Sequence, residues 1–118
     1  MQLDWHYLVS EYNFGMARVI EDGNNLILKL SIWEKIGALH KDVVVPRNKL
    51  VKKTVHKNPW SNQVLKGFRA PGAAIPFVIL LGTMRYRGGK DFTAIYKRNP
   101  VTIYEFQDTK FKRWIVTQ

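Results

Sequence analysis

Short apolar segments separated by turn residues run along most of the chain, and this spacing predicts a protein built mainly of β-strands. Segments rich in Val, Ile, Tyr and Phe recur with Gly, Pro, Asn or Asp between them, and sustained helical periodicity is rare. The clearest hairpin joins residues 16–21 to residues 26–32 through Asp22-Gly23-Asn24-Asn25, a cluster that tolerates the positive φ angles of tight turns. In the second strand Leu alternates with other residues, so one face is apolar.

A single helical turn is predicted after this hairpin. Ser31 is followed three residues later by Glu34, which is the spacing of a capping box, and Gly37 is expected to end the turn. Trp33 and Ile36 on this turn are expected to close one end of a barrel.

The rest of the chain divides in the same way. A turn over 58–62 is expected to start another short helix, and residues 67–76 are expected to form a loop because they contain two Gly and two Pro. Further strands are predicted over residues 42–46, 50–56, 77–86, 91–96 and 101–106, with a last strand or short helix over 111–117. The nearly continuous apolar residues of 77–86 indicate a strand covered on both faces, with a bulge or bend at Gly82. The three strands from 77 to 106 are expected to form an antiparallel meander.

Together these elements predict a mostly β fold, a single small antiparallel barrel or sandwich of about seven strands with one or two short helical turns. A length of 118 residues favours one domain over 1–118, with the aromatic segment 1–13 packed on it. The chain has no Cys, its first twenty residues mix acidic and apolar side chains, and its longest apolar run, 73–82, is broken by Pro76. These features lead us to expect a cytoplasmic protein.

The net charge of +10 is concentrated in the second part of the chain. Residues 1–42 carry four basic and six acidic side chains, whereas residues 43–118 carry fifteen basic and three acidic ones. Such an excess indicates either an anionic partner or a well-solvated surface.

Catalytic and metal-binding patterns are sparse. The three histidines lie far apart without a second ligand at metal spacing; they are His6, His40 and His56. The carboxylates of the basic part are expected to form structural salt bridges; they are Asp91, Glu105 and Asp108. We therefore expect no enzyme, no cofactor and no metal. A less favoured alternative is an enzyme that acts on an anionic substrate through Arg69, Arg85 and Asp91.

Two groups of basic residues are candidate binding sites for an anionic partner. The densest run lies in the first group, Arg47, Lys49, Lys52 and Lys53, followed by Lys57 and Trp60. The second group lies at two successive predicted turns and consists of Arg85, Arg87, Lys90, Lys97 and Arg98. Alternate turns of a meander fall at opposite ends, so only part of the second group is expected to share a patch. Arg87-Gly88-Gly89-Lys90 lacks the longer glycine loop and the following Ser or Thr of a Walker phosphate loop.

Several motifs resemble the signature of an uncharacterised family of small bacterial proteins. They are Gly67 to Gly72 (GFRAPG), Ile75-Pro76, Leu81 to Arg85 (LGTMR) and Arg87 to Phe92 (RGGKDF). The resemblance covers the chain from Asp22 onward and implies a bacterial cytoplasmic setting; the family has no established activity, so the resemblance implies little about mechanism.

More loosely, a strand ending in Val45-Pro46, a polar turn, a Lys-rich strand and a meander are similar to bacterial pleckstrin-homology-like (PH-like) domains. That resemblance implies a partly open seven-stranded barrel that serves as a binding or assembly module. The first predicted hairpin turn of this chain, 22–25, is acidic. Lipid-binding members of the wider class hold phosphates with basic residues at that turn.

The sequence therefore predicts a non-enzymatic binding module whose basic surface takes an anionic protein, a membrane surface or a phosphate ligand. The predicted site residues are Arg47, Lys49, Lys52, Lys53, Arg69, Arg85, Arg87 and Lys90. The alternative is a single-stranded nucleic-acid-binding protein, because basic residues beside aromatic ones are typical of such grooves. An edge strand of an open barrel would also allow a homodimer.

Overall fold

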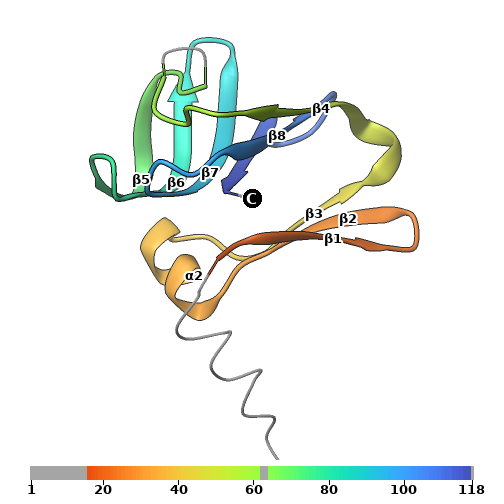
Figure 1. The fold of residues 1–118 in the computed structure, drawn as a ribbon. Helices are drawn as coiled ribbons and strands as arrows, with labels where there is room; N and C mark the ends of the chain where they lie inside the picture. Colours follow the sequence, from red (N-terminus) through yellow and green to blue (C-terminus); the bar gives the residue numbers. More distant parts are fainter. Residues whose placement is uncertain (1–15, 62–63, 118) are drawn as a thin grey trace, which may run out of the picture.

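A computed structural model describes residues 16–61 and 64–117, with the backbone alone for residues 68–71. Most of this part is β-structure, which confirms the predicted class (Figure 1). The strands are β1 (Arg18–Asp22), β2 (Asn25–Lys29), β3 (Val43–Pro46), β4 (Leu50–His56), β5 (Phe68–Ile75), β6 (Ile79–Tyr86), β7 (Gly89–Tyr96), β8 (Val101–Phe106) and β9 (Arg113–Thr117). The helices are α2 (Ile32–Ala38) and the short 3₁₀ helix η2 (Arg47–Lys49).

The strands form two open sheets, one of order β1-β2-β3 and one of order β4-β8-β9-β7-β6-β5. Figure 1 shows the small sheet lying across one face of the large one. The strand count in the described residues is nine rather than about seven, and neither sheet closes on itself.

The predicted first hairpin is confirmed. β1 and β2 pair antiparallel with Asp22 opposite Asn25, so Gly23 occupies the turn with a φ of 60°. The alternation of β2 also holds, because Leu26 and Leu28 are buried and face the core together with residues of β3.

The capping box of α2 is confirmed, and two other predictions about this helix are wrong. The Glu34 N–H donates to Ser31 Oγ at 3.2 Å, and the Ser31 N–H donates to Glu34 Oε1 at 2.8 Å. The helix continues through Gly37 and ends at Leu39, whose φ of 52° is left-handed. Trp33 and Ile36 do not close a barrel, because they lie on the outer face of α2 and are 58% and 59% exposed.

The predicted antiparallel meander is only half right. β6 and β7 pair antiparallel, but β8 does not pair with β7. The last segment is a strand, β9, which lies between them, parallel to β7 and antiparallel to β8. All five residues of β9 are buried, and a buried strand must have its backbone groups paired on both sides. Insertion between two strands meets that requirement, whereas an edge position would not.

Residues 67–76 do not form a loop, because most of them belong to the edge strand β5. A register shift between Arg69 and Gly72 accommodates Pro71, as edge strands and bulges allow. A Cβ at Gly72 would overlap the carbonyl oxygen of Leu81. The glycine here marks a close approach of two strands. The irregularity predicted at Gly82 lies in its pairing with β5, because the register shift begins at the Gly72–Gly82 pair and Gly82 has a φ of 131°. On its other side Gly82 pairs in register with β7.

Two apolar clusters cover the two faces of the large sheet. The first lies between the sheets and includes Leu28, Phe92 and Trp114. The second lies on the opposite face, around Ile95 and Ile115. β6 contributes to both clusters, which confirms the predicted two-faced covering for residues 79–84, whereas Phe77 and Val78 precede the strand and are exposed.

Two predicted features fall outside this description. The aromatic segment 1–13 lies outside the described residues, and the helix expected to start at 58–62 includes undescribed residues 62–63. Within the described ranges no helix combines the length and apolar character needed to cross a membrane.

Candidate functional site

The turn between β6 and β7 and the loop between β8 and β9 lie side by side. The parallel pairing of β7 with β9 places Asp91 opposite Arg113, and the Lys112 N–H donates to the Lys90 carbonyl at 2.8 Å. Two segments about twenty residues apart in the sequence are thereby joined at one end of the large sheet.

These two segments and the start of β5 line an open pocket of about 840 Å³. Its lining includes five cationic side chains and no acidic one. The lining residues are Gly67, Arg85, Tyr86, Arg87, Gly89, Lys90, Thr109, Lys110 and Lys112. We call this hollow the basic pocket.

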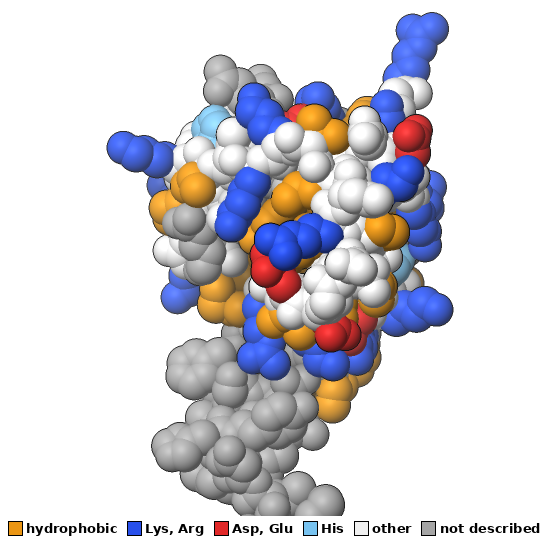
Figure 2. Space-filling view, turned by 90° about the vertical axis from the view of Figure 1, so that its right-hand side faces the viewer, with side chains coloured by type: hydrophobic (Ala, Val, Ile, Leu, Met, Phe, Trp, Pro, Cys, Tyr) orange, Lys and Arg blue, Asp and Glu red, His pale blue; other side chains and the backbone are white. Residues whose placement is uncertain are grey.

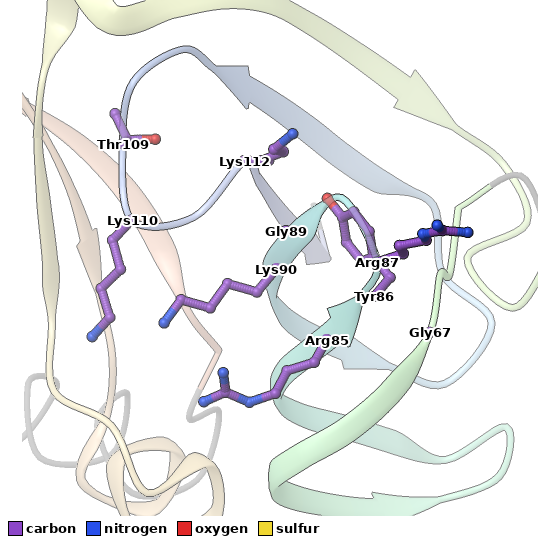
Figure 3. Close-up of a pocket in the computed structure, with 9 residues that line it drawn as sticks. All are labelled: Gly67, Arg85, Tyr86, Arg87, Gly89, Lys90, Thr109, Lys110 and Lys112. Carbon is purple, nitrogen blue, oxygen red and sulfur yellow. The ribbon is translucent and has the colours of Figure 1, made fainter.

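Three of the cations point into the same space. Figure 3 shows Arg85, Lys90 and Lys110 extending toward one another on one side of the pocket, whereas Arg87 leads away from them. Burial lowers the pKa of Lys90, and the positive charges of Lys110 and Arg85 lower it further. The three groups therefore repel one another, and an anion placed between them would relieve this repulsion.

Aromatic rings, rather than carboxylates, support the two lysines. The Nζ atoms of Lys90 and Lys110 lie 5.3 Å and 5.4 Å from the centre of the Phe111 ring, within the range of cation–π attraction. Lys110 Nζ also lies 3.2 Å from Nε2 of His40. Among the described residues no carboxylate lies within 4 Å of either lysine, so their charges are not neutralised locally.

A buried ion pair anchors the pocket to the core. Asp91 is fully buried, and its Oδ2 accepts from Arg113 Nε at 2.9 Å and from Arg113 Nη2 at 2.6 Å. Arg113 Nη2 also donates to the Val64 carbonyl at 2.7 Å. The Tyr86 hydroxyl donates to Asp91 Oδ1 at 2.7 Å. Burial, followed by this bond to Asp91, raises the pKa of Tyr86 to about 12.

The predicted structural salt bridge of Asp91 is thus confirmed. Its carboxylate is engaged by Arg113 and Tyr86 and has no exposed surface. A catalytic role for Asp91 beside Arg85 has no support from this geometry, and the Arg69 side chain lies outside the description.

The basic run over residues 47–53 does not converge. Arg47 Nη2 lies 3.3 Å from Glu21 Oε1, and Lys52 lies across the strand pair from Glu105. Lys52 and Lys53 are successive residues of β4, so their side chains point to opposite faces of the sheet. Figure 2 shows cations scattered over the end of the molecule that carries β4, with acidic side chains between them.

The second basic group, at the two turns that follow β6 and β7, is split between two places, as expected for turns at opposite ends of the strands. Arg85, Arg87 and Lys90 line the basic pocket, whereas Arg98 lines a different hollow with Lys57 and Trp60. Sequence reasoning missed Lys110 and Lys112, because the order of β7, β9 and β8 in the sheet places their loop beside Lys90. The only local signal was the basic character of that loop.

The comparisons with known proteins give no guide to this pocket. Comparison with models of protein families, with curated proteins and with solved structures finds no match to the chain. The described part of the chain also holds no group of three or more His, Asp or Glu side chains able to bind a metal ion. The function must therefore be argued from the geometry.

Proposed function

We propose that the protein is a binding module that holds an anionic group, of the phosphate type, in the basic pocket. The observation that carries this proposal is the convergence of Arg85, Lys90 and Lys110 without a described carboxylate at the lysines. Like charges held close together repel one another, and a bound anion would replace this repulsion with attraction.

The donor set suits a phosphate group better than a single carboxylate. A guanidinium presents two parallel N–H donors, and each ammonium presents three, so the pocket offers more donors than one carboxylate accepts. A phosphate group with three accessible oxygens can receive all three side chains. The group would belong to a free ligand or to a phosphate-bearing macromolecule, and inorganic phosphate is the probe for the chemistry that these two sources share.

Single-stranded nucleic acid is the alternative ligand, and the pocket gives it less support. Such grooves stack bases on exposed aromatic rings. In the basic pocket the Phe111 ring is 1% exposed, and Tyr86 is half-buried and bonded to Asp91. The pocket therefore offers charge without a stacking platform.

The test compares two double variants that change the net charge equally. Lys90→Glu/Lys110→Glu reverses the pocket, whereas Lys52→Glu/Lys53→Glu reverses two exposed cations on β4. Binding of inorganic phosphate and of single-stranded RNA is measured by calorimetry over a series of salt concentrations.

We expect the pocket variant to lose at least about tenfold in phosphate affinity, since each hydrogen bond to a charged group contributes about 1.5 to 3 kcal/mol. The β4 variant is expected to bind phosphate as the wild type does. Equal losses in both variants would show that only net charge matters and would refute the proposal. Binding of RNA but not of phosphate, with a steep salt dependence, would favour the nucleic-acid alternative.

The PH-like architecture stays a prediction. The mostly β scaffold and the strand ending in Val45-Pro46 support it, whereas the open sheets and the final strand β9 differ from a barrel capped by a C-terminal helix.

A further inference from the structure

The turn between β5 and β6 places a bulky aromatic residue where the backbone favours glycine. The Val78 N–H donates to the Ile75 carbonyl at 2.9 Å, which closes a four-residue turn with Pro76 in its second position. Phe77, in the third position, has a φ of 62°. A Pro-led turn with positive φ at this position is of the type II pattern, which prefers Gly or Asn there. Local backbone preference therefore does not explain the choice of Phe.

The same turn exposes three apolar side chains. Ile75, Phe77 and Val78 are 57%, 52% and 49% exposed. Figure 1 shows the turn that joins β5 and β6 projecting from the end of the large sheet. Isolated exposed apolar residues are ordinary, but three on one projecting turn form a contiguous apolar tip. We call these three residues the apolar tip.

The neighbouring structure holds the tip in place and puts positive charge beside it. Lys97 N–H donates to the Val78 carbonyl at 2.7 Å, and Trp60 Nε1 donates to the Lys97 carbonyl at 2.6 Å. The Trp60 ring packs against Phe77 with centroids 5.5 Å apart, and the Arg98 guanidinium lies 4.7 Å from the Phe77 centroid. The β7–β8 turn is thereby fixed beside the tip.

Two cationic side chains border the apolar tip: Lys57, which lines a hollow with Phe77, and Arg98, whose guanidinium lies over the Phe77 ring. Among the described residues neither of them lies within 4 Å of a carboxylate. An apolar projection bordered by unneutralised cations matches the interface of an anionic bilayer, where acyl chains lie beneath negatively charged headgroups.

We propose that the protein docks on an anionic lipid bilayer through the apolar tip, with the bordering cations Lys57 and Arg98 against the headgroups. The inference goes beyond the proposed function, since the tip shares no residue with the basic pocket. A stacked nucleotide base fits the tip less well, because Arg98 and Trp60 already lie against the Phe77 ring. Docking at the tip leaves the basic pocket, at the other end of β6, free for its own ligand.

The test is flotation of the full chain with phosphatidylcholine vesicles, with and without phosphatidylglycerol. Wild-type protein is expected to bind the anionic vesicles at least about tenfold more strongly, because each cation near such a surface contributes about fivefold in partition. Phe77→Gly is the decisive variant, since glycine suits the positive φ and the turn is expected to form without the ring. We expect at least about tenfold weaker binding in this variant.

Val51→Gly provides the matched control, because Val51 is 62% exposed near the start of β4, at the end of the large sheet opposite to the tip. It is expected to float as the wild type does. Absence of wild-type binding to anionic vesicles would overturn the inference. Unchanged binding of Phe77→Gly, or an equal loss in Val51→Gly, would also overturn it. The pocket variant Lys90→Glu/Lys110→Glu distinguishes the two proposals, because it is expected to lose phosphate binding and to retain most vesicle binding.

Discussion

Replacing Arg113 by Met is expected to destabilise the whole fold and the basic pocket together. Arg113 Nε and Nη2 both bond the buried Asp91 carboxylate, and Nη2 also bonds the Val64 carbonyl. Met has a similar apolar stem but no donor. The substitution therefore leaves the Asp91 carboxylate in the core with the Tyr86 hydroxyl as its remaining described partner.

The magnitude follows from burial. Asp91 has no exposed surface, and the Arg113 side chain is 10% exposed. Removal of one partner of such a buried pair costs about 3 to 5 kcal/mol, out of a total unfolding free energy of about 5 to 15 kcal/mol. For a domain of this size each kcal/mol corresponds to roughly 4 °C in Tm, so a fall of about 12 to 20 °C is expected.

Urea unfolding followed by circular dichroism measures this loss. The double variant Asp91→Leu/Arg113→Met is the control, because it removes the buried charge along with its partner and is expected to be more stable than Arg113→Met alone. A loss below about 1 kcal/mol in Arg113→Met would show that the pair acts like an exposed salt bridge. A double variant less stable than Arg113→Met would refute the role assigned to the uncompensated charge.

Three further predictions concern the helix α2 and the pocket wall. Burial, opposed by its hydrogen bonds, raises the pKa of Glu34 above its usual 4.5, so the folded state binds the Glu34 proton more tightly than the unfolded state. The unfolding free energy should therefore fall as pH rises from about 4.5 through the raised pKa. Thermal denaturation over a pH series should show a flatter profile in Glu34→Gln, and identical slopes would contradict this. Ser31→Ala removes the side-chain acceptor of the capping box and should cost about 1 kcal/mol in chemical denaturation, unless water replaces the bond fully. Gly67→Ala should cost about 2 kcal/mol or more, because a Cβ there would overlap the Arg85 carbonyl and φ is 76°. Gly88→Ala, whose Cβ would meet nothing closer than 3.8 Å, should leave stability nearly unchanged, and equal losses would contradict the steric argument.

Features set by neighbouring residues could be predicted from the sequence. The β1–β2 hairpin, the capping box of Ser31 and Glu34, and the two-faced burial of most of β6 all follow from patterns within a few residues. The separation of Arg85 and Lys90 from Arg98 also followed, because alternate turns lie at opposite ends of their strands.

Features that depend on distant pairing were missed. Glycine and proline predicted a loop over 67–76, but the same residues serve an irregular edge strand whose Gly72 lies close to Leu81. The meander rule predicted that β8 would pair with β7, but the buried strand β9 lies between them. Neither the edge strand β5 nor the position of β9 can be predicted from a short stretch of sequence. Both depend on which strand still has an unpaired edge when the sheet forms.

By itself, then, the sequence determined that the protein is rich in β-strands, where its turns and capping box lie, and that its second part is strongly basic. Only the tertiary structure decided which basic residues act together. In the basic run over residues 47–53, Arg47 and Lys49 lie on η2, whereas Lys52 and Lys53 point to opposite faces of the edge strand β4, so the charges separate. The parallel pairing of β7 and β9 brings Lys110 beside Arg85 and Lys90. The net charge follows from the composition. Where the charges gather depends on the order of the strands, and contacts between residues distant in the sequence establish that order.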